Sequence, residues 1–158
     1  MTVQTRNLPS KEPHNYTLAE YLLREARVAS KHEFYNGLII KMAGAKFKHN
    51  AIASNTLSAL NAALKTLEKK YWAINSDQKV YLESENIALY PDALVICEKP
   101  EYWNGREDLL TNPLLIVEVA SKTTRQYDRG EKFMLYRSLP SFRPNELVVI
   151  ELIEYTHF

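Results

Sequence analysis

The feature that most constrains the fold is a change of hydrophobic period near residue 70. In residues 47–69, apolar residues recur at steps of three and four and predict one long helix with a single apolar stripe: Ala53, Leu57, Leu60, Leu64 and Leu67. Beyond it, four segments are typical of strands: WAINSDQKVYL, NIALY, DALVICE and LLIVEVA. The 158-residue chain is therefore expected to be α+β or mixed α/β, a sheet with helices packed on it.

The flanking segments extend this plan. Thr17 and Glu20 have the spacing of a capping box and predict a short helix in TLAEYLLREARV. Asn36-Gly37 in HEFYNGLIIKM predicts a hairpin with a type I′ turn. KPEYWNGREDLLTNP is typical of a loop or short helical excursion, and we expect a helix over about 124–138 and a last strand in ELVVIELIEY. We divide the chain into a flexible N-terminal arm, residues 1–16, and a single domain, residues 17–158.

Composition narrows the function classes. A formal net charge of +1 provides no global field for nucleic acid, so any such binding requires a local patch. Cys97 is the only cysteine, which excludes an intramolecular disulfide and favours a reducing, cytoplasmic location. The sequence has no apolar run of membrane-spanning length and no zinc-finger or helix-turn-helix signature. We expect no membrane span and no organic cofactor.

One carboxylate lies in the most apolar strand. In LLIVEVAS, Glu118 shares a strand face with Ile116 and Ala120. An isolated ionised carboxylate in such surroundings shifts its pKa or finds a cation. Asp92 lies at the mouth of the strand DALVICE, directly after Pro91. Two carboxylates on neighbouring strands repel each other unless a divalent ion lies between them, and Mg²⁺ suits oxygen ligands of this kind.

A simpler interpretation remains open. A strand glutamate is more often paired with a lysine or arginine, and an aspartate after proline is a common turn residue. Lys122 follows Glu118 by four residues within a polar turn. Lys132 lies in the helical stretch beyond the turn, where Asp128 and Lys132 have the i,i+4 spacing of a modest surface ion pair.

Three segments together resemble the Uma2 family of the PD-(D/E)xK nuclease superfamily, which is abundant in cyanobacteria and described as restriction endonucleases: HEFYNGLIIKM, YPDALVICE and IVEVASKTTRQYDRGEKFMLYRSLPSFR. The resemblance covers residues 17–143, and its strand–turn–helix segment is the most specific part. It implies a restriction-endonuclease-like fold, a central mixed sheet flanked by helices, with an N-terminal helix and hairpin. It also implies two acids that hold Mg²⁺ and a lysine that orients water and stabilises charge on the scissile phosphate.

Residue by residue, the resemblance assigns Asp92 and Glu118 as the metal-binding acids and Lys132 of DRGEK as the lysine. The superfamily pattern places a lysine two residues after the second acid, where this chain has Ala120. The Uma2 version instead takes the lysine from the following helix. Lys122 stands where the family more often has proline, and it ranks second.

Four further residues receive supporting roles from the same resemblance. Glu33 matches an acid on the early hairpin that completes the metal site in related nucleases, against the alternative of an exposed strand glutamate. His49 matches a histidine at the start of the long helix, where it contacts phosphate, caps the helix or faces solvent. Gln78 matches a polar position that lines such sites, and Asp128 would orient Lys132.

The implied activity is Mg²⁺-dependent hydrolysis of DNA phosphodiester bonds, with Mn²⁺ as a substitute metal and with Lys46 and Lys48 contacting the DNA backbone. Three alternatives remain. One is an inactive nuclease-fold module that binds DNA or a protein partner. Another is a structural subunit whose carboxylates pair with Lys132 and Arg125. The last is a metal hydrolase that acts on a small phosphorylated substrate.

The C-terminal segment departs from the family. After Arg143, the usual aromatic-rich strand is replaced by PNELVVIELIEYTHF, which we interpret as a truncated or frame-shifted tail. ELVVIELIEY is β-prone, and at a sheet edge it could pair with another copy of the chain. A homodimer is therefore expected, and it would suit an enzyme that cuts both strands of a duplex.

Overall fold

The structure is a computed structural model that describes residues 15–120, 128–141 and 148–151; the side chains of residues 128–129 and 148–151 are not included. Nearly all of the expected arm at residues 1–16 lies outside the described residues. In the parts of the chain that are described, no helix is both long and apolar enough to cross a bilayer.

The first elements form as their local chemistry predicts. Helix α1, Leu18–Glu25, begins with the capping box of Thr17 and Glu20. Strands β1, His32–Tyr35, and β2, Leu38–Lys41, form an antiparallel hairpin. Its two central residues, Asn36 and Gly37, have φ angles of 43° and 102°, both positive as a type I′ turn requires.

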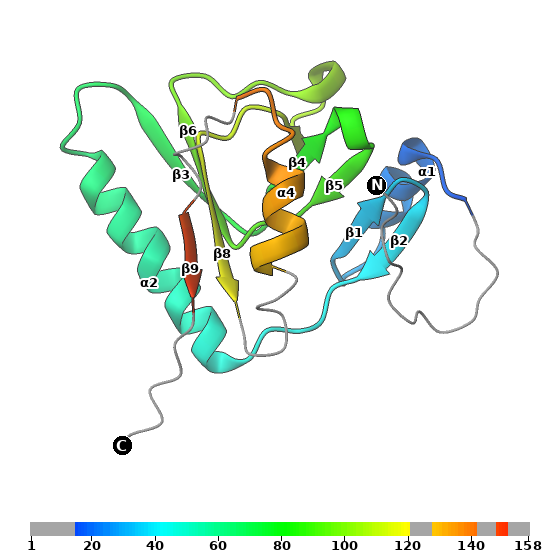
Figure 1. The fold of residues 1–158 in the computed structure, drawn as a ribbon, viewed down its shortest axis with the longest axis horizontal. Helices are drawn as coiled ribbons and strands as arrows, with labels where there is room; N and C mark the ends of the chain where they lie inside the picture. The colour runs from blue at the N-terminus through cyan, green and yellow to red at the C-terminus, as the bar shows by residue number, and fades with distance from the viewer. Residues whose placement is uncertain (1–14, 121–127, 142–147, 152–158) are drawn as a thin grey trace.

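The strand-like segments form two mixed sheets (Figure 1). The five-stranded sheet has the order β2-β1-β5-β4-β7 and the four-stranded sheet the order β3-β6-β8-β9. The pairs β4–β7 and β8–β9 are parallel, and the other pairs are antiparallel. The strands not yet delimited are β3 Tyr71–Asn75, β4 Lys79–Leu82, β5 Ile87–Leu89, β6 Ala93–Cys97, β7 Leu109–Leu110, β8 Leu115–Ala120 and β9 Val148–Glu151. The predicted α+β class with a mixed sheet is confirmed.

The strand-like segment WAINSDQKVYL forms two strands, β3 and β4, and the reason for the division is local. The side-chain oxygen of Asn75 accepts a 3.0 Å hydrogen bond from the Asp77 backbone N–H, an Asx turn that ends β3. The chain then passes from the four-stranded sheet to the five-stranded sheet. Gln78, which we expected on a strand, lies in the bend before β4. The segment KPEYWNGREDLLTNP follows β6 and contains the short 3₁₀ turn η2, Trp103–Gly105, in agreement with the expected loop or short helical excursion.

The long helix is shorter than predicted. Helix α2, Phe47–Leu64, ends before Leu67, whose side chain is 51% exposed. The helix packs on β3, β6 and β8 and covers one side of the four-stranded sheet (Figure 1). None of its residues is fully buried.

The last helix and the core complete the frame for the site. Asp128–Lys132 form a π-helical turn, η3, that continues into α4, Phe133–Tyr136. The predicted start of this helix near residue 124 lies outside the described residues. Tyr136 and Leu139 pack with apolar residues of both sheets in the main core: Val80, Leu82, Ile87, Leu89, Leu94, Ile96, Leu110 and Ile116. The two sheets and α4 thus share one core.

Candidate active site

Glu118 lies within the four-stranded sheet. It is part of β8, between β6 on one side and β9 on the other, and it is 5% exposed. Five of the six residues of β8 are buried. A charged group in this environment requires a compensating partner.

The partner is Lys132. Its Nζ lies 3.3 Å from Glu118 Oε1 and 3.1 Å from Glu33 Oε1. All three side chains are buried, with 7–9% exposed. Lys132 ends the π-helical turn, a rare backbone form that often occurs at functional sites. One lysine therefore joins β1 of one sheet to β8 of the other, whereas the rival Lys122 lies outside the described residues.

Two tyrosines complete this cluster, and sequence analysis missed both. The Tyr136 hydroxyl donates a 2.6 Å hydrogen bond to Glu118 Oε1, and the Tyr35 hydroxyl donates a 2.7 Å bond to Glu33 Oε2. Their spacing offered a signal. Tyr136 is one helical turn beyond Lys132, and Tyr35 is two residues beyond Glu33 on the same strand face.

The electrostatics of the cluster are dominated by burial. Desolvation raises the pKa of Glu118 from 4.5 to about 7, against the opposing effects of Lys132 and of the Tyr136 hydrogen bond. The negative charges of Asp92 and Glu33 raise it further. Burial and the Glu118 charge also raise the pKa of Tyr136 well above its usual value. Burial therefore favours the protonated form of Glu118 more than in an exposed glutamate.

Asp92 lies just before β6 and is held by two contacts. Its Oδ2 accepts a 2.6 Å hydrogen bond from the Val119 backbone N–H, and its Oδ1 lies 3.3 Å from His49 Nε2. The register of β6 against β8 pairs Ala93 with Val117, and its continuation by one residue places Asp92 opposite Glu118. His49, in the first turn of α2, therefore belongs to the same region as the two acids.

Two polar atoms of this region are buried without a hydrogen bond. Among the described residues these are Glu33 Oε1 and His49 Nδ1. Glu33 Oε1 has the ion pair with Lys132, while no contact is recorded for His49 Nδ1. Such atoms are rare in native proteins and often mark a ligand or catalytic role.

A divalent ion such as Mg²⁺ needs oxygen ligands that lie close together. The described residues contain no group of three or more histidine, cysteine or acidic side chains placed to hold a metal. Glu33, predicted as a third ligand, has its Oε1 3.1 Å from Lys132 Nζ, and its role in metal binding stays a prediction. Asp92 and Glu118 remain as opposed carboxylates, and Mg²⁺ typically uses only one or two carboxylates together with waters and substrate phosphate. The chemistry of this pair fits Mg²⁺.

The other predicted residues lie apart from the cluster or cannot be placed. The Gln78 amide donates to the backbone carbonyls of Lys79 and Glu107, each at 3.2 Å. The side chain of Asp128 lies outside the described part of the chain, so its proposed role on Lys132 stays a prediction.

Comparisons with known proteins identify the family and the fold. The family model Uma2, described as "Putative restriction endonuclease", matches residues 18–143. Two uncharacterized proteins of Synechocystis sp. are similar to this chain. The protein sll1609 is 35% identical over 84% of this chain and 73% of its own length. The protein slr1290 is 32% identical over 85% of this chain and 69% of its own length. A crystal structure from Anabaena variabilis, described as "a putative nuclease belonging to DUF820", has the same fold: its TM-score is 0.63 at 21% identity, over 86% of this chain and 74% of that chain.

Proposed function

The chain belongs to the Uma2 family, and from that premise we propose that it is a divalent-metal-dependent endonuclease that hydrolyses DNA phosphodiester bonds. The observation that carries the proposal is the buried acid–lysine cluster in which Lys132 bridges Glu33 and Glu118 opposite Asp92. Ionisable groups with strongly perturbed pKa values are concentrated at functional sites, and structural ion-pair networks also produce them.

Asp92 and Glu118 would hold Mg²⁺ or Mn²⁺, which when bound lowers the pKa of a coordinated water and polarises a phosphate oxygen. Only the ionised form of Glu118 is a ligand. Because the pKa of this carboxyl is about 7, metal affinity should rise between pH 6 and pH 8. The Val119 N–H and His49 hold the Asp92 carboxylate in place beside β8.

Lys132 would stabilise the negative charge that develops on the phosphate. Its position is set by Glu33 and Glu118, which hold the ammonium group between the two sheets. Tyr35 and Tyr136 orient these carboxylates by donating hydrogen bonds to them. A fixed cation of this kind needs no rearrangement during the reaction.

One observation favours a second candidate, a nuclease-fold module that binds DNA or a protein without cutting it. Lys132 already neutralises part of the charge on Glu33 and Glu118, as expected of a cluster that serves the fold alone. Such a protein would bind no divalent ion with Glu118.

The test is nicking of supercoiled plasmid and of single-stranded DNA in Mg²⁺, Mn²⁺ or EDTA. We expect Asp92→Ala and Glu118→Ala each to reduce the rate by about a hundredfold or more. The matched control is Glu131→Ala, which removes an exposed carboxylate from the turn that carries Lys132 and should cut like the wild type. Metal-independent DNA binding without nicking would support the binding module instead, and full activity in both acid variants would contradict the assignment of Asp92 and Glu118 to the active site.

A homodimer is part of this proposal. Strand β9 is the last strand of the four-stranded sheet in the described residues, so its outer edge is available for pairing with a second copy. Light scattering of the purified protein tests this directly, and the mass of one chain would contradict it.

A further inference from the structure

Positive charge is concentrated along α2 and the turn that follows it. Residues 46–75 contain five lysines and one glutamate, a formal charge of +4, whereas the whole chain has a net charge of +1. Helix α2 itself contains no acidic residue. The remainder of the chain is therefore net acidic, and this segment is a local basic region on a nearly neutral protein.

The exposed side of α2 carries small hydrogen-bonding side chains. Exposed residues recur at steps of three and four on one face: Asn50, Ser54, Ser58, Asn61 and Lys65. The opposite face packs on the four-stranded sheet. Asparagine and serine are common donors to phosphate oxygens and sugars, and their small size permits close approach of a backbone.

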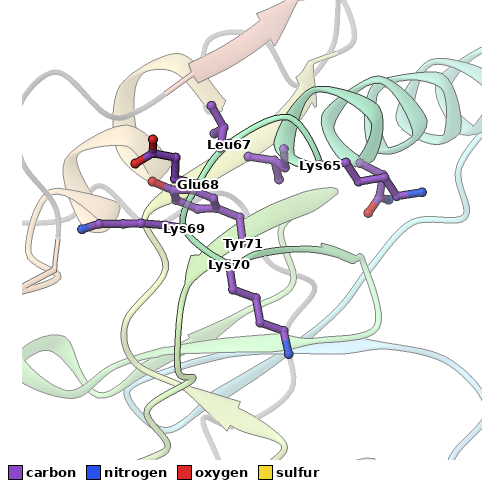
Figure 2. Close-up of a pocket in the computed structure, with 8 residues that line it drawn as sticks. Lys65, Leu67, Glu68, Lys69, Lys70 and Tyr71 are labelled. Carbon is purple, nitrogen blue, oxygen red and sulfur yellow. The ribbon is translucent and has the colours of Figure 1, made fainter.

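A hollow of about 340 Å³ lies where α2 ends and β3 begins. It is lined by three lysines, Lys65, Lys69 and Lys70, together with Asn61, Leu64, Leu67, Glu68 and Tyr71. Figure 2 shows that the three lysine side chains point away from one another. Diverging ammonium groups do not enclose one small anion, but they match the spaced charges of a polyanion.

The two ends of α2 are separated by the length of the helix. Its 18 residues span roughly 27 Å at 1.5 Å per residue. His49 in the first turn faces Asp92 of the candidate active site, and Lys65 follows the last turn. Phosphates of one DNA strand are about 3.4 Å apart along the duplex axis, so this length corresponds to roughly 8 base pairs.

We propose that the exposed stripe of α2, together with the lysines that line the hollow at its C-terminal end (Lys65, Lys69 and Lys70), binds the sugar-phosphate backbone of a DNA duplex. The scissile phosphate of this duplex would lie at the candidate active site. This inference rests on the proposed nuclease function and names how its substrate is held. A duplex fits the surface because the length of the stripe matches a row of evenly spaced phosphates. Exposed rings that could stack on bases also lie at both ends of the surface, where Phe47 is 86% exposed and Trp72 is 43% exposed, so single-stranded DNA is the alternative that the experiment has to exclude.

The experiment measures binding of a labelled duplex of about 20 base pairs by fluorescence anisotropy, in EDTA to prevent cleavage, over a series of salt concentrations. The test variant is Lys65→Ala/Lys69→Ala/Lys70→Ala, and Lys69→Ala alone is the milder version. The matched control is Arg24→Ala/Arg27→Ala/Lys41→Ala, which removes three exposed positive charges around α1 and β2, away from the C-terminal end of α2 in Figure 1.

We expect the test variant to bind about tenfold or more weakly at low salt. Its slope of log affinity against log salt should be less negative by about 2 to 3, close to 0.9 for each lost phosphate contact. Lys69→Ala should change the slope by about 1. The control triple should keep the wild-type slope, and thermal unfolding establishes that each variant is folded.

The outcomes separate this inference from the nuclease function. A wild type that binds duplex but never cuts would refute the nuclease function and leave the basic surface supported, provided that the test variant loses affinity as expected. An unchanged slope in the test variant, a loss confined to single-stranded DNA, or no duplex binding by the wild type would overturn the inference.

Discussion

Two buried glutamates in this molecule have similar exposure and different surroundings. The Glu25 side chain at the end of α1 is 6% exposed, and that of Glu118 in β8 is 7% exposed. Glu25 Oε1 accepts hydrogen bonds from the His32 backbone N–H at 2.8 Å and from the Tyr90 hydroxyl at 3.0 Å. Its Oε2 lies 3.0 Å from His32 Nδ1. Both carboxylate oxygens of Glu25 thus have protein partners.

Among the described residues around Glu118, carboxylates outnumber the one lysine. Glu118 shares Lys132 with Glu33 and experiences the charge of Asp92, which helps to raise its pKa. Since burial is nearly equal, burial alone does not distinguish a functional carboxylate from a structural one. An unbalanced cluster, in contrast to a satisfied one, calls for an additional cation.

The largest effect that follows from this difference concerns Lys132. We expect Lys132→Met to lower the free energy of unfolding by about 3–5 kcal/mol at pH 8 in EDTA, because Glu33 and Glu118 are left buried without their cation. The loss should be smaller at pH 5, where a carboxyl with a raised pKa is protonated. Urea denaturation at both pH values measures it.

Lys79→Met is the matched variant in the region around Glu25. Lys79 is 8% exposed, but its carboxylate partner Asp108 lies 3.6 Å away with a side chain that is 41% exposed. Removal of Lys79 therefore leaves Asp108 accessible to water, and we expect a loss of about 1 kcal/mol. Equal losses in the two lysine variants would contradict the distinction between the clusters.

A second effect is the pH dependence of stability contributed by Glu118. Its pKa is 4.5 when exposed and about 7 in the folded protein, so the folded state binds the proton more tightly. Stability should fall as pH rises from about 4.5 to about 7, by on the order of 3 kcal/mol in total. Glu118→Gln resembles the protonated form and should flatten this dependence. We expect the variant to be more stable than the wild type at pH 8 in EDTA.

Urea denaturation at closely spaced pH values provides the measurement. If Glu118→Gln is less stable than the wild type at pH 8, pairing with Lys132 outweighs burial, and the cluster is as balanced as that of Glu25. Added Mg²⁺ should stabilise the wild type at pH 8 and leave the variant unchanged if Glu118 is a metal ligand.

The parts of the fold that depend on a few neighbouring residues could be predicted from the sequence. Thr17 with Glu20 indicated the start of α1, and Asn36-Gly37 indicated the hairpin, because each motif satisfies its own backbone. The division into two sheets was not foreseen. It depends on an Asx turn at Asn75 within a run of otherwise strand-like residues, where local propensity for strand continues on both sides.

The candidate site also has features that the sequence indicated and features that it did not. An apolar strand with one carboxylate indicated that Glu118 needs a cation, and this follows from burial alone. That Lys132 also pairs with Glu33 depends on how β1, β8 and α4 meet around a shared core, which no local pattern encodes. For the same reason the sequence did not indicate that Glu33 lies beside the lysine, and its predicted role as a metal ligand stays a prediction.

A third effect concerns Glu25 itself. Glu25→Ala should lower the free energy of unfolding by about 1–3 kcal/mol, because the His32 N–H and the Tyr90 hydroxyl lose their buried acceptor. The rate of plasmid nicking per folded molecule should be unchanged, since the partners of Glu25 are His32 and Tyr90, outside the Lys132 cluster. Tyr90→Phe, which removes one of these hydrogen bonds, should have about half the effect. If folded Glu25→Ala protein loses its nicking activity, the two clusters act as one site, and a fully satisfied carboxylate then says nothing about whether a region is structural.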